Sequence, residues 1–244
     1  MRVTRCGGAG LLAALPLLFA WQSLWAGSFA ISPLRAELSP GSETQVVRIT
    51  NEGDSTLSVQ VQGFRWSQDD NGDDRFEPAE SLIAVPTVFS IEPGERQIVR
   101  VGILDPEYTK LEQSYRLFFT ELAPPAAESG PGVSMRLRVS IPAFLAPADE
   151  ARPRISLERF ARDGDMARIT LRNTGKQHVQ IRRLSLHSGP SSDGQTIDSA
   201  GGIYLLPGTV RTFAHASLDS SGAITMRLEG DTTGFLEYVL PMGP

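Results

Sequence analysis

Residues 133–141 carry a strict alternation of apolar and polar side chains. The run reads VSMRLRVSI, with an apolar residue at every odd position and Ser or Arg at every even one. Because successive side chains of a strand point to opposite faces, this pattern predicts a strand with one continuous apolar stripe. The ten residues before it, 123–132, hold three prolines and two glycines and predict an irregular loop.

The apolar stripe of residues 133–141 has two interpretations. It can fill the core of the chain's own sandwich, as the last strand of such a fold ordinarily does. It can also be lent to the core of another protein. The alternation is compatible with both.

Short alternating strands, separated by turns rich in Gly, Asn and Asp, precede this stretch. This spacing is typical of an antiparallel sandwich of the immunoglobulin type. Asp105 and Pro106 predict the start of a single helical turn that ends near Leu111. The expected strands are 29–40 (broken by prolines), 43–51, 57–66, 81–85, 88–91, 96–103 and 114–122.

An acidic stretch at residues 67–74 contains the turn-forming pair Asn71 and Gly72. Read as a calcium loop, it places Pro78 where a bidentate glutamate is needed. We therefore expect a solvated hairpin tip.

The pattern restarts after residues 146–153, which are polar and flanked by prolines and predict a domain boundary. No long helical period occurs, so the chain is expected to be all-β with two immunoglobulin-like β-sandwich domains, 27–147 and 148–244. Residues 188–202, rich in Gly and Ser, predict a loop. The expected strands are 155–160, 167–172, 178–186, 202–205, 209–215, 223–228 and 235–240.

Residues 1–26 resemble a secretory signal peptide. Arg2 and Arg5 precede the apolar run 11–20, and small residues follow near Ala26. A membrane anchor is the alternative, but the run is short and interrupted by Pro16. The only cysteine lies in this segment, so we expect an exported, periplasmic protein stabilised by apolar cores and not by disulfides.

No recognisable catalytic chemistry accompanies this pattern. The net charge of -5 is spread among both signs, which makes nucleic acid an improbable partner. No Gly-x-Ser-x-Gly elbow or closely spaced histidine pair occurs, and His178, His187 and His215 are expected to be ordinary residues. We expect no catalytic residue, metal or cofactor.

Three segments together resemble the periplasmic chaperones of the chaperone-usher pathway for bacterial pili, and most of all the archaic branch, which assembles pili of spore-coat-U-like subunits. Each motif is weak alone, but their order and spacing are specific. The segments are 32–40 (SPLRAELSP), 89–100 (FSIEPGERQIVR) and 115–125 (YRLFFTELAPP).

The resemblance implies a boomerang of two domains that binds pilus subunits, each a sandwich lacking its last strand. The chaperone fills the gap with its own strand and delivers the subunit to an outer-membrane usher. Here the donor residues would be Val133, Met135, Leu137 and Val139. Self-association of the free chaperone through this edge is also expected.

The resemblance further implies a basic pair that binds the subunit's terminal carboxylate. Arg35 matches the first member, but the position of the second is Pro142, so Arg116 or Arg138 is expected to replace it. The basic member of the family's interdomain charge cluster is replaced by Ala146, which leaves Asp231 as a candidate acidic member without an identified partner.

Two other classes of function remain as alternatives. An exported pilus subunit or adhesin would lack its last strand, whereas this chain has one. An exported β-sandwich enzyme or sugar-binding module would need a polar cleft with converging carboxylates or aromatic rings.

Overall fold

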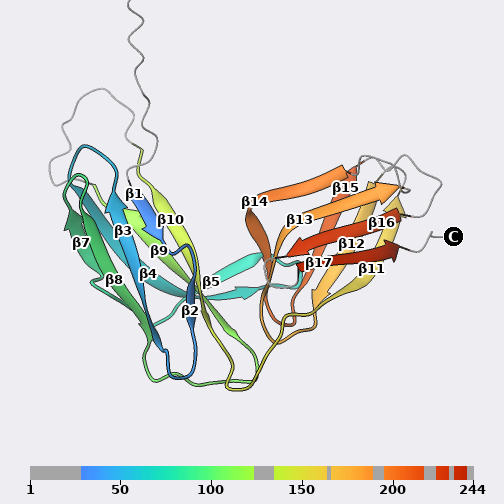
Figure 1. Cartoon of the computed structure of the whole chain (residues 1–244), viewed down its shortest axis with the longest axis horizontal. Coiled ribbons are helices and arrows are strands. Elements are labelled where there is room, and N and C mark those ends of the chain that lie inside the picture. The colour runs from blue at the N-terminus through green and yellow to red at the C-terminus, as the bar shows by residue number, and fades with distance from the viewer. Residues whose placement is uncertain are drawn as a thin grey trace, which may run out of the picture.

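A computed structural model describes residues 29–123, 135–163, 166–188, 195–216, 224–230 and 234–240. The described residues form strands and connecting segments, arranged as two β-sandwiches that make the two arms of a V (Figure 1). Within these ranges, no helix is long and apolar enough to cross a membrane. The predicted all-β class with two immunoglobulin-like sandwiches is confirmed.

The first sandwich packs two sheets around one apolar core. One sheet has the order β1 (Phe29–Ser32), β3 (Thr44–Asn51), β8 (Arg96–Ile103) and β6 (Leu82–Val85). The other has the order β2 (Ala36–Leu38), β10 (Arg138–Leu145), β9 (Gln113–Glu121), β4 (Leu57–Gln68) and β5 (Asp74–Pro78), and β7 (Val88–Ile91) also pairs with β4.

Strand β9 shows how alternation sets the two faces of the second of these sheets. Tyr115, Leu117 and Phe119 are buried in the core of the sandwich. Arg116 and Phe118 alternate with them and therefore lie on the outer face. This outer face is the one that turns toward the second sandwich.

The second sandwich repeats the arrangement with its own core. Its sheets are β11 (Ile155–Asp163), β12 (Met166–Asn173) and β15 (Val210–Ala216), and β14 (Gln195–Leu205), β13 (Val179–Ser188), β16 (Ile224–Gly230) and β17 (Gly234–Leu240). Every strand predicted here is found. The loop predicted at residues 188–202 is partly wrong, because β14 begins at Gln195 and pairs with β13.

Three further expectations need correction. Residues 104–112 form no helical turn, because Asp105 has a φ of 47° instead of the extended backbone of a helix cap. Strand β5 was not predicted. The last strand of the first sandwich begins at Arg138 and not at residue 133.

Two residues named in the sequence analysis, Val133 and Asp231, lie outside the described residues.

Candidate functional site

Strand β10 has one edge that is largely unpaired. It pairs with β9 along its whole length on one side. On the other side, β2 pairs only with the last three residues of β10. Among the described strands none covers the remaining edge, so this part of β10 can pair with an added chain through backbone hydrogen bonds.

The apolar stripe leading into β10 is divided between the chain's own core and the surface. Ile141 is buried, and Leu137 and Val139 pack against the core only in part. Met135 is 81% exposed. The chain before β10 is tied to β9 by Glu121, whose backbone N donates to Leu137 O (2.9 Å) and whose Oε2 accepts from Leu137 N (3.0 Å).

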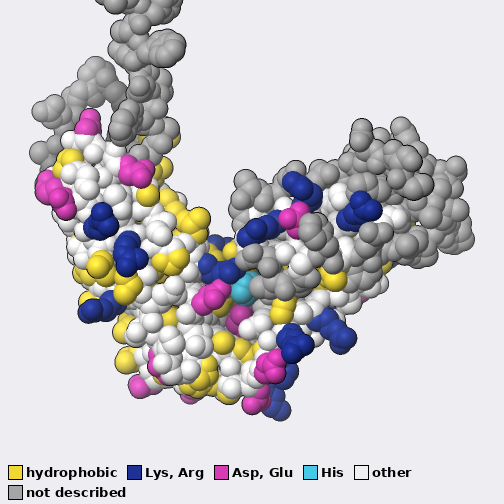
Figure 2. All heavy atoms as spheres, in the orientation of Figure 1, with side chains coloured by type: hydrophobic (Ala, Val, Ile, Leu, Met, Phe, Trp, Pro, Cys, Tyr) yellow, Lys and Arg dark blue, Asp and Glu magenta, His cyan; other side chains and the backbone are white. Residues whose placement is uncertain are grey.

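A crevice of about 710 Å³ separates the two sandwiches. Arg35 and Glu37 line it from the first sandwich, and Gln180, Arg182 and Tyr204 line it from the second. Figure 2 shows both basic and acidic side chains around the base of the notch between the arms. Arg35 Nε lies 2.8 Å from Glu37 Oε1, so the candidate anchor Arg35 already has a carboxylate partner.

Arg116 lies next to Tyr204, which lines the crevice, and its guanidinium packs against aromatic rings. Its guanidinium carbon is 4.0 Å from the centroid of the Trp66 ring and 5.5 Å from that of Tyr204. Its Nε is buried without a hydrogen-bond partner. Among the described residues no carboxylate forms an ion pair with it.

Burial lowers the pKa of the Arg116 guanidinium, and the negative charge of Asp74 opposes that shift. An arginine remains charged under all ordinary conditions. The site therefore offers a cation with N–H donors in a partly dry environment, which suits a carboxylate.

Arg138 occupies a different place on the same face. Its guanidinium carbon lies 4.3 Å from the centroid of the Phe118 ring, which also contacts Phe64 and Phe76 edge-on. Arg138 pairs across from Thr120, whereas Arg116 pairs across from Pro142, four residues further along β10. Arg116 thus contacts Tyr204, which lines the same crevice as Arg35, whereas Arg138 lies farther up the sheet.

A buried pair joins the two sandwiches beside this site. His178 Nδ1 lies 2.8 Å from Glu112 Oε1, and the backbone N of His178 donates to the same oxygen (3.0 Å). The imidazole stacks on Phe144, with ring centroids 3.7 Å apart. Phe144, Trp66 and Leu206 form the apolar cluster of this junction. His178, expected to be an ordinary strand or loop residue, directly precedes β13 and makes an interdomain contact.

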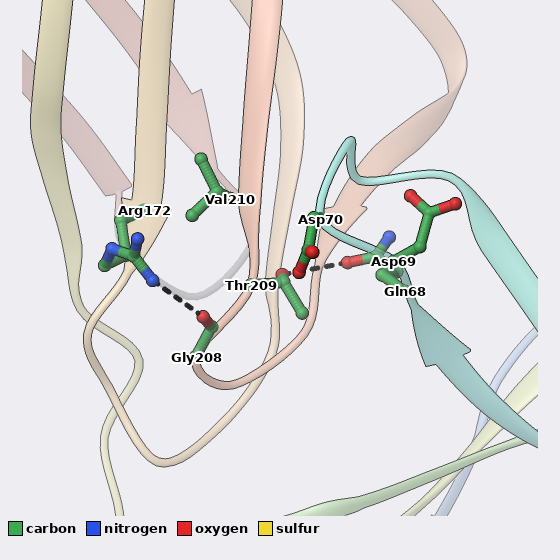
Figure 3. A pocket seen from close by; sticks show the side chains of 7 residues that line it. All are labelled: Gln68, Asp69, Asp70, Arg172, Gly208, Thr209 and Val210. Atoms are coloured by element: carbon green, nitrogen blue, oxygen red, sulfur yellow. Dashed lines mark hydrogen bonds between the residues drawn. The ribbon is translucent and has the colours of Figure 1, made fainter.

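The tip of the β4–β5 hairpin also contacts the second sandwich. Arg211 Nη1 donates to Gly72 O (3.1 Å), and the tip encloses a small polar hollow together with Arg172 and Thr209 (Figure 3). The predicted hairpin exists, but its tip is docked and not simply solvated. No cluster of metal-binding side chains occurs among the described residues.

Sequence reasoning missed the second-sandwich half of the site. Tyr204 and His178 carry no motif, and nothing in their neighbourhood of the sequence indicates that they face Arg116 or Glu112. The only available signal was Trp66, a large aromatic residue at the outer-face position of a strand that ends in a hairpin.

Comparison with known proteins places this geometry in a family. Residues 28–150, half of the chain, match the family described as pili and flagellar-assembly chaperone, PapD N-terminal domain. No curated protein sequence matches the chain.

Several solved structures share the fold of the whole chain. A chain of the CsuC–CsuE chaperone–tip adhesion subunit pre-assembly complex, from archaic chaperone-usher Csu pili of Acinetobacter baumannii, has a TM-score of 0.61 at 20% identity, covering 88% of this chain and 97% of that one. The YadV chaperone has a TM-score of 0.61 at 17% identity and coverages of 88% and 100%. The chaperone DraB of E. coli has a TM-score of 0.59 at 16% identity and coverages of 88% and 98%.

Proposed function

This chain belongs to the family of pili and flagellar-assembly chaperones, and on that premise we propose that it binds pilus subunits in the periplasm by strand donation and delivers them to an outer-membrane usher. The observation that carries the proposal is the uncovered edge of β10 beside a basic crevice. The same edge is proposed to allow self-association of the free chaperone. We place the boundary between the two domains at residues 147 and 148.

The donated strand consists of the chain before β10 and the first part of β10. Backbone groups of this edge pair with a subunit strand, and Met135, Leu137 and Val139 enter the groove in the subunit's core, preceded by Val133. Burial of three such side chains contributes about 5 to 9 kcal/mol by transfer free energy, before the cost of ordering the chain. The high exposure of Met135 supports this role, since a side chain of the chain's own core would be covered.

The crevice fixes the register of the bound subunit. Arg116 and Arg35 are proposed to bind the terminal carboxylate, and Arg116 is the stronger candidate because its N–H groups have no carboxylate partner whereas Arg35 pairs with Glu37. Arg138, which stacks on Phe118, is proposed as a contact further along the subunit strand.

No covalent step is required in this mechanism. Subunit binding exchanges solvent-exposed edges for a paired strand, and release follows when another subunit's strand fits the groove better. We therefore propose that the protein is a binding chaperone and not an enzyme.

The alternative of a pilus subunit or adhesin is disfavoured by the first sandwich itself. Such a subunit lacks its last strand, whereas here β10 pairs with β9, and Ile141, Ala143 and Leu145 complete the core.

Co-purification from periplasm with the pilin encoded beside the chaperone tests strand donation. We expect the wild type to retain the pilin and a Met135→Asp, Leu137→Asp variant to lose it, because two charges cannot enter an apolar groove. Ile98→Asp is the matched control, since Ile98 is 46% exposed in the sheet that lacks β10. Equal retention by the double variant, still folded by circular dichroism, would exclude the stripe as donor.

A further inference from the structure

A hydrogen-bond relay at the β4–β5 hairpin connects Trp66 and Tyr204, the two residues whose rings flank Arg116. Gln68 and Asp74 face each other across the hairpin. Asp74 Oδ1 accepts from the indole Nε1 of Trp66 (2.9 Å) and from Nε2 of Gln68 (3.0 Å). One carboxylate oxygen therefore orients both the indole and the amide.

Gln68 carries this relay across the junction to the second sandwich. Its Nε2 also donates to the carbonyl oxygen of Tyr204 (2.9 Å), and its Oε1 accepts from Leu206 N (3.0 Å) and Thr209 Oγ1 (2.9 Å). Both amide protons and both lone pairs of the Gln68 side chain are thus used. Figure 3 shows Gln68 and Thr209 meeting from the two sandwiches.

The relay ends on both residues whose rings contact the Arg116 guanidinium, at the indole of Trp66 and at the backbone carbonyl of Tyr204. Trp66, which is 3% exposed, is held through its indole N–H, and Tyr204 is held through its backbone. The guanidinium lies between them, 4.0 Å from one centroid and 5.5 Å from the other. Rings attract the cation without using its N–H donors in ordinary hydrogen bonds, so these donors remain for an incoming acceptor.

We infer that Gln68 and Asp74 are positioning residues that hold Trp66 and Tyr204 around Arg116, so that the guanidinium presents its N–H groups to the terminal carboxylate of a bound chain. This inference rests on the proposed function, in which Arg116 binds that carboxylate. It adds that the carboxylate site is completed only when the hairpin tip is docked on the second sandwich.

The test measures how well the chaperone distinguishes a free carboxylate from an amide. The probes are two synthetic peptides with the sequence of the last strand of the pilin encoded beside the chaperone, one ending in a carboxylate and one amidated. Protein produced without residues 1–26 retains Trp66 as its only tryptophan, because Trp21 and Trp25 lie in that segment. Its fluorescence therefore reports directly on the ring that contacts Arg116.

We expect the wild type to bind the carboxylate peptide about tenfold more tightly than the amide. Gln68→Glu removes both side-chain N–H donors with no change of size, and Asp74→Leu removes the acceptor. Each variant should bind the carboxylate peptide no more than about twofold more tightly than the amidated peptide, and its affinity for the amidated peptide should equal that of the wild type. Asp74→Asn keeps an acceptor oxygen without the charge and should keep the preference. Gln97→Glu, in the sheet that lacks Arg116, is the control for added negative charge.

The outcomes separate the inference from the function on which it rests. If Arg116→Ala abolishes the preference but Gln68→Glu and Asp74→Leu retain it, the positioning role is excluded and the carboxylate site stands. If Asp74→Asn loses the preference as fully as Asp74→Leu, Asp74 acts through its charge and the relay is excluded. If Arg116→Ala keeps the preference, the carboxylate site itself is misplaced and the inference fails with it.

Discussion

Asn51 and Asn173 occupy equivalent corners of the two sandwiches and use their amides in the same way. Each ends a strand, β3 or β12, and is fully buried. Each side-chain oxygen accepts from the backbone N of the glycine two residues later, Gly53 or Gly175. Each side-chain nitrogen donates to two carbonyl oxygens, and in both cases one of these belongs to a distant strand.

Asn173→Asp should lower the free energy of unfolding by about 2 to 4 kcal/mol at neutral pH, because a carboxylate cannot donate to the carbonyls of Gln177 and Leu205 and is charged where it is buried. Urea unfolding at pH 7 measures this. Asn71→Asp is the control, since Asn71 is exposed at the hairpin tip. Equal urea midpoints for Asn173→Asp and Asn71→Asp would show that the corner at Asn173 does not need the side-chain amide.

A second prediction concerns the ion pair between Arg35 and Glu37. The Glu37 side chain is 64% exposed, so the pair contributes little to stability, but Glu37 competes with a bound carboxylate for Arg35. Glu37→Gln should therefore tighten binding of a carboxylate-ended pilin peptide by roughly twofold to fivefold and leave the amidated peptide unaffected. Isothermal titration of both peptides checks this, and weaker binding of the carboxylate form would show that Arg35 is not an anchor.

At the scale of elements, the β4–β5 hairpin bridges the two sandwiches, and the carboxylate of Asp69 stabilises the fold of its tip. Asp69 accepts from the backbone N of Asp73 and of Asn71 (both 3.0 Å) and pairs with Arg75. The hydrogen bond from Asp73 and the guanidinium of Arg75 hold the pKa of Asp69 below its ordinary value of 3.8. The folded tip thus favours the ionised carboxylate.

The sign of the pH dependence follows from this direction. A carboxyl group with a depressed pKa stabilises the folded tip above its ordinary pKa, and the contribution is lost as the pH falls through the ordinary and then the folded value. Amide hydrogen exchange at Asn71 and Asp73 should accelerate, relative to an exposed reference loop, below about pH 4. Asp69→Asn should show fast exchange at neutral pH and no such step; a step that persists in this variant would assign it to another group.

Strands were predictable wherever one face is buried, because apolar and polar residues then alternate along the sequence. Strands β9 and β12 are examples, with every second residue buried over most of their length. Strand β5 escaped prediction because all five of its residues are exposed, so no apolar face marks it. The first half of β14 escaped because Gly and Ser there indicate a loop, although pairing with β13 makes it a strand.

The candidate site was predictable only on its first-sandwich side. Arg35 could be named because it matches the first member of the basic pair that the family resemblance implies, and Arg116 because Pro142 occupies the place of the second. Gln68 and Tyr204 could not be named, since they are 136 residues apart and meet only through the angle between the sandwiches. No local period of the sequence encodes that angle.

At the scale of the whole molecule, most of the described hydrogen bonds across the junction involve a backbone group. Gln68 binds backbone groups of Tyr204 and Leu206, Arg211 binds Gly72 O, and Glu112 binds the backbone N of His178. Each of these hydrogen bonds joins a side chain of one sandwich to a backbone group of the other, so one end of every contact has no rotamer freedom. Together they link the two sandwiches at several points beside the crevice.

Glu112 provides the test of this arrangement, because it is 8% exposed and meets both the backbone N and Nδ1 of His178. Glu112→Ala leaves both groups buried without an acceptor, at a cost of about 1 to 3 kcal/mol each. We expect the junction to loosen, with a broader distribution of distances between spin labels at Ile98 and Arg168, one on each arm. Glu112→Gln keeps an acceptor oxygen and should keep the narrow distribution.

The consequence for binding follows from the two halves of the site. In the proposed mechanism, strand donation uses only β10 and the chain before it, all in the first sandwich, whereas the proposed carboxylate site also needs Tyr204 from the second. A loosened junction should therefore reduce the preference for a free carboxylate while leaving affinity for the amidated peptide nearly unchanged. If Glu112→Ala broadens the distances but keeps the preference, the crevice binds its ligand through the first sandwich alone, and Arg116 would act without the ring of Tyr204.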